Sequence, residues 1–377
     1  MPEAPPDPDY LARARALAPQ IAAAAAEIER RREVPPEIAD ALIEAGFYRL
    51  LLPRSLGGAE LPPAAYVPVI EEIAKADAST AWCLNQAGGC AMTAAYLAPE
   101  AARAVFGPPD GILAWGPGPG EARVAPGGYR VTATWSFASG SHNASWLGAH
   151  VPIVEADGKP RLNPDGSPVI RTVLFPKQKA RMTDIWHVIG LKGTGSDRFS
   201  VENLFVPEAY CVHRDAPEAR REAGLLYRFS SLQLYSSGFA GVALGIARAS
   251  LDAFVELARD KVPFRAARSL REDNVVQAEV ARAEARLKAA RAFLYRSLEQ
   301  ITAAVAARGH PTLDERMTIR LASTFAIHEA VAVVDACYHA AGSTAIFEDN
   351  PFERRFRDVH AVCQQLQGRQ EHFETVG

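Results

Sequence analysis

The chain has 377 residues, with 41 basic and 44 acidic side chains and a pI near 6.3. This length is sufficient for two or three structural units that share a large buried core. Because positive and negative charges are balanced, the chain has no overall field that attracts nucleic acid or an anionic membrane, and neither is expected as a partner.

Cysteine usage and the N-terminal sequence predict a cytoplasmic protein. The five cysteines are dispersed and include no CxxC pair, so neither a disulfide framework nor a metal site is expected. The chain begins with an acidic, proline-rich segment that lacks the basic and apolar regions of a secretory signal. No uninterrupted apolar run is long enough to cross a bilayer.

The first third of the chain has helical periodicity. Apolar residues recur at three- and four-residue steps over 12–32, 37–45 and 64–76, and prolines and glycines separate these segments. A cluster of two prolines and a glycine follows Phe106. We therefore predict an N-terminal helical domain over residues 1–110.

The composition changes in the middle of the chain. Residues 112–207 are rich in Val, Thr, Tyr, Trp and Gly, and the runs 129–134 and 199–206 alternate between apolar and polar side chains. This pattern predicts a small antiparallel β-domain over residues 111–215.

Helical periodicity returns after residue 215. Four segments are expected to form an up-and-down bundle over residues 216–377, namely 234–258, 276–305, 313–340 and 351–373. Asp273 is positioned to cap the second of them, which would be roughly 45 Å long at 1.5 Å per residue. The predicted fold class is α+β, with helical, sheet and helical-bundle domains in that order.

Residues 134–146 combine aromatic side chains, hydroxyl groups and a glycine where strand periodicity meets a turn. Such a mixture suits a flat aromatic ligand with polar edges, for example a flavin ring. The alternative is a β-hairpin in which Trp135 and Phe137 are core residues and the polar cluster is only a turn. Taken alone, the segment favours the hairpin.

Motifs along the whole chain occur in the order typical of one family. They are 45–53, Leu56-Gly57-Gly58 and 77–82 in the first third, 127–131, 135–140 and 189–196 in the middle, and Gly342-Ser343 and 354–358 near the end. With these motifs the chain resembles the acyl-CoA dehydrogenase superfamily. The resemblance implies that family's fold and a bound flavin, either FAD or FMN.

The resemblance also implies which residues bind the flavin. They are Trp135, Phe137, Ser139, Gly140, Thr194, Ser196, Arg265, Gln277, Gly342 and Ser343. Trp135 and Phe137 would form a wall for the ring, and Ser139 would bind its polar edge. Gln277 would face the dinucleotide or phosphate part, across a subunit boundary, so a homo-oligomer (dimer or tetramer) is expected.

Two reaction classes share this scaffold. A dehydrogenase needs a carboxylate base to remove a proton next to the thioester, but this chain has Gln367 where the family often has a glutamate. The motifs 135–142, 190–196 and 356–361 look more like the branch of flavin-dependent hydroxylases. In this branch we predict catalytic roles for His372, Ser139, Gln365 and Gln367, and substrate contacts for Trp82, Ser141 and His142.

The expected function is that of the oxygenase component of a two-component flavin monooxygenase. It would hydroxylate a small aromatic or polycyclic substrate, with reduced flavin supplied by a separate reductase, because no NAD(P)H-binding motif is visible. One alternative is an FAD-dependent acyl-CoA dehydrogenase with a relocated base, for which Glu348, Glu371 and Glu374 are candidates. A second alternative is a non-catalytic member of the family. Members usually continue past the position of Gly377.

Overall fold

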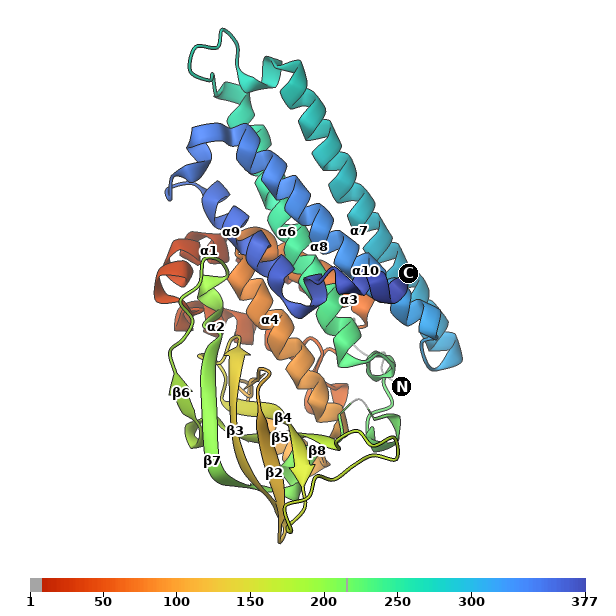
Figure 1. Ribbon diagram of the computed structural model, residues 1–377. Coiled ribbons are helices and arrows are strands. Elements are labelled where there is room, and N and C mark those ends of the chain that lie inside the picture. Colours follow the sequence, from red (N-terminus) through yellow and green to blue (C-terminus); the bar gives the residue numbers. More distant parts are fainter. Residues whose placement is uncertain (1–8, 215) are drawn as a thin grey trace, which may run out of the picture.

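The computed structural model describes residues 9–214 and 216–377 and arranges them as helices, a sheet and a second group of helices in chain order (Figure 1). The N-terminal helices are α1 (Tyr10–Arg31), α2 (Pro36–Glu44), α3 (Pro63–Ala76), α4 (Ala78–Ala91) and α5 (Pro99–Phe106). The first three match the predicted segments. α4 is buried over nearly its whole length, so it has no polar face from which its periodicity is readable.

The sheet contains β1 (Leu113–Ala114), β2 (Gly120–Ala125), β3 (Gly128–Ala138), β4 (Trp146–Val154), β5 (Ile170–Pro176), β6 (Arg181–Thr183), β7 (Asp197–Pro207) and β8 (Cys211–Val212). Their order is β6-β7-β3-β2-β4-β5-β8, and β1 pairs with β4. β1 and β2 each run parallel to β4, whereas the other pairs are antiparallel. The sheet is therefore mixed, not purely antiparallel as predicted.

Trp135 lies at the centre of the sheet's core. It pairs with Phe199 across β3 and β7, and the two rings stack with centroids 4.9 Å apart. Phe175 of β5 lies 6.2 Å from the same indole, although several strands separate β5 from β3 in the sheet order. The sheet must therefore curl so that its two halves enclose Trp135, which is fully buried.

The glycines at 116–120 have a packing role. A Cβ on Gly116 would lie 1.8 Å from the Ser136 carbonyl oxygen, and one on Gly118 would lie 2.1 Å from that of Thr134. Between these glycines, the Pro117 and Pro119 carbonyls accept backbone hydrogen bonds from β3. The glycines let this segment lie directly against β3, where any side chain would collide with the backbone.

The C-terminal helices are α6 (Ser231–Asp260), α7 (Asn274–Arg308), α8 (Leu313–Ala341), α9 (Pro351–Gln364) and α10 (Glu371–Val376). α6 runs through the middle of the molecule, between the N-terminal helices and the rest of the bundle (Figure 1). The predicted cap holds, because the Asp273 carboxylate accepts from the Val275 N–H at 2.7 Å. Capping boxes also begin α6 and α8.

The predicted helix over 351–373 is broken in the structure. α9 ends at Gln364, and the Gln365 side chain accepts a hydrogen bond from the Gln367 N–H in place of a helical partner. Gly368 then passes so close to α9 that a Cβ would lie 2.5 Å from the Cys363 carbonyl oxygen. The chain reverses here before α10 begins.

Two helical segments, Ser231–Asp260 and Leu313–Ile346, are long and apolar enough to cross a membrane by length and composition. Within their most apolar windows, 78% and 50% of the residues are buried inside the molecule. Core helices of soluble proteins have the same character.

A buried carboxylate joins the N-terminal helices to the bundle. Glu71 of α3 is 4% exposed. Arg291 of α7 donates from Nε to both of its oxygens at 3.0 Å, and the Tyr295 hydroxyl donates to one of them. The Arg291 side chain is itself half exposed, so solvent screens part of this attraction.

We expect Arg291→Met to lower the free energy of unfolding by about 1–3 kcal/mol, because it leaves the buried Glu71 carboxylate with Tyr295 as its remaining partner. Urea denaturation measures the change. Arg296→Met is the matched control, since Arg296 pairs with Glu299 at the surface and its side chain is 73% exposed. Equal losses in the two variants would contradict the importance of the buried contact.

Candidate active site

Four side chains from separate parts of the chain form a continuous series of hydrogen bonds. Trp82 Nε1 of α4 donates to Ser139 Oγ at 3.0 Å, and Ser139 Oγ lies 2.6 Å from Ser196 Oγ. Ser196 Oγ lies 2.7 Å from Thr194 Oγ1, which donates to the Leu191 carbonyl at 2.9 Å. All three hydroxyl groups are buried. We call this series the hydroxyl chain.

The protons of the hydroxyl chain have a defined direction. Each hydroxyl has one proton to donate, and that of Thr194 is used for the Leu191 carbonyl. Ser196 must then donate to Thr194, and Ser139 to Ser196. The predicted cofactor residues Ser139, Thr194 and Ser196 are thus brought together, but their protons are used within the chain and for the Leu191 carbonyl. Their hydrogen bonds attach the loop 190–196 to β3 and α4.

Phe137 presents an aromatic face to the outside of the sheet. Its backbone has φ 62°, its side chain is 59% exposed, and its ring meets Trp186 edge-on at 5.9 Å. A positive φ is strained for a bulky residue, and such strain is concentrated at functional sites. Beside it, Arg198 Nε donates to Ser136 Oγ at 3.2 Å. An aromatic face, a hydroxyl and a guanidinium therefore lie together at this end of β3.

Trp135 has a different environment from Phe137. Its indole is enclosed in the sheet core and offers no face to a ligand, so the structure does not support its predicted role as a wall of the flavin ring. The β3–β7 register shifts between Trp135 and Ala138. This irregularity, with the positive φ of Phe137, turns two side chains that would share one face of a regular strand to opposite faces.

A series of stacked aromatic rings begins at the hydroxyl chain. The Trp82 and Phe239 rings stack with centroids 4.0 Å apart, and the Phe239 and Tyr235 centroids lie 5.9 Å apart. We call these three residues the aromatic wall. The α4–α6 contact that carries it depends on Gly238, where a Cβ would lie 1.8 Å from Asn85 Oδ1. The predicted substrate residue Trp82 thus belongs both to this wall and to the hydroxyl chain.

The other polar groups of the turn after β3 form hydrogen bonds or ion pairs with groups of the protein itself. The Gly140 N–H donates to the Thr194 carbonyl at 2.9 Å. Ser141 is fully buried, with its hydroxyl on the Gly195 carbonyl. The two ring nitrogens of His142 lie 2.7 Å from a Glu33 oxygen and 2.8 Å from an Asp197 oxygen. Against expectation, neither Ser141 nor His142 presents an unoccupied polar group to a substrate.

The predicted catalytic residues near the C-terminus lie together. The Gln365 amide nitrogen is buried and has no acceptor in the described part of the chain, and Gln367 is also buried. His372 Nε2 lies 2.8 Å from the Leu366 carbonyl. If Nε2 carries the proton for that contact, Nδ1 of the neutral ring is left as an acceptor. Their roles in catalysis stay predictions.

Four other predicted cofactor residues lie in the connections, or in the first turn of α7, at the end of the bundle away from the sheet (Figure 1). The Arg265 guanidinium lies over Phe264, and Gln277 donates to the Arg271 carbonyl. Gly342 and Ser343 are exposed at the end of α8. None of the four has a recorded hydrogen bond or ion pair to the hydroxyl chain within the described residues.

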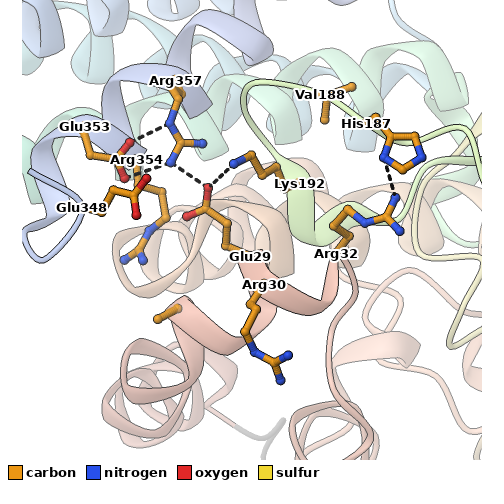
Figure 2. Close-up of a pocket in the computed structure, with 11 residues that line it drawn as sticks. Glu29, Arg30, Arg32, His187, Val188, Lys192, Glu348, Glu353, Arg354 and Arg357 are labelled. Atoms are coloured by element: carbon orange, nitrogen blue, oxygen red, sulfur yellow. Dashed lines mark hydrogen bonds and ion pairs between the residues drawn. The ribbon is translucent and has the colours of Figure 1, made fainter. Parts of the chain in front are cut away.

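A cavity of about 550 Å³ lies between α1, the loop 187–192 and the start of α9, and its lining is highly charged. Figure 2 shows Glu29 at its centre, with one carboxylate oxygen 3.0 Å from Lys192 and 2.6 Å from Arg357. Glu348, a candidate base for the dehydrogenase alternative, lines it, whereas the residues predicted for the hydroxylase do not. Because substrate pockets for aromatic molecules are mostly apolar, we do not assign it to the substrate.

The loop 190–196 is also held from α9. The Leu191 N–H donates to Asp358 Oδ1 at 2.6 Å, and Gly190 packs so closely that a Cβ would lie 2.1 Å from the Arg357 carbonyl oxygen. Complete burial raises the pKa of Asp358 to about 7, partly opposed by the Leu191 hydrogen bond. A buried acid thus anchors the loop that carries Thr194 and Ser196.

Asp358→Asn should make the free energy of unfolding less dependent on pH. A folded-state pKa above the unfolded value favours the protonated acid, so this stabilising contribution is complete below pH 3.8 and is lost as the pH rises to about 7. The variant should therefore gain stability relative to the wild type by about 1.4 kcal/mol per pH unit across that window. Urea unfolding at several pH values tests this, with the exposed Asp349→Asn as control. A difference in unfolding free energy between variant and wild type that stays constant with pH would refute this prediction.

Several residues of the site carry no motif that we recognised. Tyr235, Phe239 and Arg198 were not predicted, because each meets the site through contacts far apart in the sequence. One signal was present for the two aromatic residues. Gly238, Gly241 and Gly245 follow helical spacing, a pattern typical of a face where another helix approaches closely.

Removing the central hydroxyl of the chain should destabilise the protein. In Ser196→Ala, Ser139 loses its acceptor and Thr194 loses a donor in a buried site, so we expect a loss of about 1–3 kcal/mol in the free energy of unfolding. The control is Ser167→Ala, whose hydroxyl contacts Asp165 in an exposed turn. A loss no larger than that of the control would show that the hydroxyl chain contributes little.

Comparisons with known proteins agree with this architecture. Residues 11–109 match the family model of the acyl-CoA dehydrogenase N-terminal domain, and residues 237–368 match that of the C-terminal domain. An indole-3-acetate monooxygenase of Pseudomonas putida is 32% identical over 343 residues, which cover 90% of this chain and 85% of the relative. The oxygenase component of an FADH2-dependent resorcinol hydroxylase from a Rhizobium species is 29% identical, with 90% and 85% covered.

The solved structures extend the likeness to the fold. The crystal structure of a 3-HSA hydroxylase from a Rhodococcus species superposes with a TM-score of 0.89 at 26% identity and covers 98% of this chain and 96% of its own. The predicted α+β fold and the expected flavin-dependent oxidoreductase activity are confirmed by these matches. The chain therefore belongs to the acyl-CoA dehydrogenase superfamily, within its branch of flavin-dependent monooxygenases.

Proposed function

We propose that this protein is the oxygenase component of a two-component flavin monooxygenase that hydroxylates a small aromatic substrate. The observation that carries the proposal is the 3.0 Å hydrogen bond from Trp82 Nε1 to Ser139 Oγ. It joins the aromatic wall to the hydroxyl chain, next to the exposed end of β3. A substrate surface and a cofactor surface thereby adjoin one another.

The residues at the exposed end of β3 fit a flavin, either FAD or FMN. Phe137 offers an uncovered aromatic face, and Ser136 and Arg198 add a hydroxyl and a positive charge beside it. A ring with polar edges and a phosphate-bearing tail needs these two kinds of contact. Reduced flavin supplies the electrons that activate oxygen, and a separate reductase would supply the reduced flavin.

The aromatic wall suits an aromatic substrate. Trp82 and Phe239 are almost fully buried, and stacked rings provide large apolar contact areas while excluding water. The hydroxyl chain holds Trp82 by its only polar atom, so the orientation of the indole is determined. We assign Trp82 to the positioning of the substrate.

The amides Gln365 and Gln367 support a monooxygenase over a dehydrogenase. An amide does not accept a proton at neutral pH, whereas oxidation of an acyl thioester needs a base. The buried Gln365 amide nitrogen, without an acceptor in the described residues, is available as a hydrogen-bond donor to a ligand. His372 remains our proposed acid–base residue.

We also propose a cytoplasmic homo-oligomer, a dimer or tetramer, in which a second copy completes the cofactor site. Arg265 and Gln277 lie in or just after the α6–α7 connection, where Phe264 is 90% exposed. Large exposed apolar side chains there and near Gly342 are expected to be covered in an assembly. The predicted contacts of these residues would then reach the flavin of the partner.

Reconstitution tests the proposed activity. With NADH, an unrelated flavin reductase, FAD or FMN and a panel of phenols and indoles, we expect a product that carries one atom of oxygen from ¹⁸O₂. Chemically reduced flavin should replace the reductase in a single turnover. Acyl-CoA thioesters should not bleach the oxidised flavin. Bleaching by a thioester, with no oxygenated product from the panel, would refute the proposal.

A further inference from the structure

Arg214 lies between β8 and α6 and contacts the far end of the aromatic wall. Its guanidinium carbon is 4.5 Å from the centre of the Trp115 ring and 5.9 Å from that of Tyr235. Nη2 donates to the Gly89 carbonyl of α4 at 2.7 Å. Trp115, which follows β1, therefore meets α4 and α6 at this one cation.

The charge of Arg214 has no counter-ion in residues 9–214 and 216–377. No carboxylate oxygen of these residues lies within 4.0 Å of its guanidinium. Nε is buried and has no hydrogen-bond acceptor. Arg214 as a whole is partly buried. Taking part of a cation out of water is costly unless it is paired, and aromatic faces compensate only part of that cost.

Cys90 and Tyr235, two titratable groups of the described residues that interact with Arg214, do not supply a negative charge. Burial raises the pKa of the Cys90 thiol to about 12 and raises the pKa of the Tyr235 hydroxyl well above its ordinary value, although Arg214 opposes both shifts. Both groups are therefore neutral at pH 7. They contact each other, with Cys90 Sγ 3.5 Å from Tyr235 Oη.

Arg214 is connected to the hydroxyl chain through the aromatic wall. Tyr235 contacts Arg214 and stacks on Phe239, which stacks on Trp82. The wall thus has neutral hydroxyl groups at one end and, at the other, a cation that has no counter-ion among the described residues. A ligand that complements both its rings and its charge is an aromatic molecule with an anionic substituent.

We propose that Arg214 is the anchor for the carboxylate of an aromatic substrate whose ring lies on the aromatic wall. This inference rests on the proposed function and specifies its substrate class. A guanidinium pairs well with a carboxylate because its N–H groups match the two oxygens. Arg214 would act as a specificity residue and would leave the oxidation to the other end of the wall.

The alternative is that Arg214 only packs Trp115 and Tyr235 together. In that case its replacement would lower the affinity for every aromatic ligand to a similar extent. If Arg214 is an anchor, its replacement should weaken the binding of charged ligands only. The two alternatives are therefore separated by a matched pair of ligands that differ only in charge.

The test measures binding to the full-length protein, without turnover, by isothermal titration calorimetry. The probes are indole-3-acetate, after which the Pseudomonas relative is named, and its uncharged methyl ester. We expect the wild type to prefer the carboxylate, and Arg214→Gln to weaken it about tenfold or more while changing the ester less than about twofold. Arg214→Lys should restore part of the loss.

Arg220→Gln is the matched control. Arg220 also donates to one backbone carbonyl, that of Tyr227 at 2.8 Å, and has no ion pair within the described residues. This variant should leave both affinities unchanged. Equal weakening of acid and ester in Arg214→Gln, or no preference in the wild type, would overturn the anchor. If Arg214→Gln does not fold, the same comparison is made with Arg214→Met, which also removes the charge.

Failure of the anchor and failure of the proposed function are distinguishable. The calorimetric comparison requires no hydroxylation, so a charge-dependent loss stands even when no oxygenated product forms. Conversely, hydroxylation of uncharged phenols by Arg214→Gln at the wild-type rate would support the function, whatever the binding results for the carboxylate.

Discussion

The site depends on one constraint, which is that three buried hydroxyl groups with one proton each must satisfy one another. The Thr194 proton is used for the Leu191 carbonyl, and this choice determines the donors at Ser196 and Ser139. Trp82 then has Ser139 as its acceptor. Leaving a buried donor without an acceptor would cost about 1–3 kcal/mol. Any arrangement that breaks one of these hydrogen bonds is therefore unfavourable, and β3, α4 and the loop 190–196 are held in one arrangement.

The same loop is held on its other side by charges. Asp358 accepts from the Leu191 N–H, and Glu29 joins Lys192 of the loop to Arg357 of α9. The hydroxyl chain and these charged groups respond differently to pH. The hydroxyl chain is neutral and independent of pH near neutrality, whereas burial raises the pKa of Asp358 to about 7. The loop therefore combines a constant attachment to the sheet with a titratable attachment to the bundle.

Periodicity predicted the long helices well, since an exposed face and a buried face leave a clear pattern, as in α7 behind its Asp273 cap. It did not predict which way Trp135 and Phe137 point. In a regular strand both would face the core, and only the β-bulge, a backbone feature, separates them. The break at Gln365 was missed for a similar reason, because it depends on how closely Gly368 approaches Cys363. Arg214 carries no local signal, as its contacts come from α4, α6 and Trp115.

The distribution of charge along the aromatic wall connects the fold to its chemistry. The hydroxyl chain beside Trp82 is neutral and brings no water-attracting charge to the rings, and the positive charge of Arg198 lies at the exposed end of β3, where the flavin is proposed to bind. The structure places the cation of Arg214 at the opposite end, beyond Phe239 and Tyr235. A charged substituent can then contribute binding energy and orientation without changing the polarity where oxygen is transferred. In the proposed assignment, recognition and oxidation would be separated by the length of three stacked rings, which α4 and α6 carry.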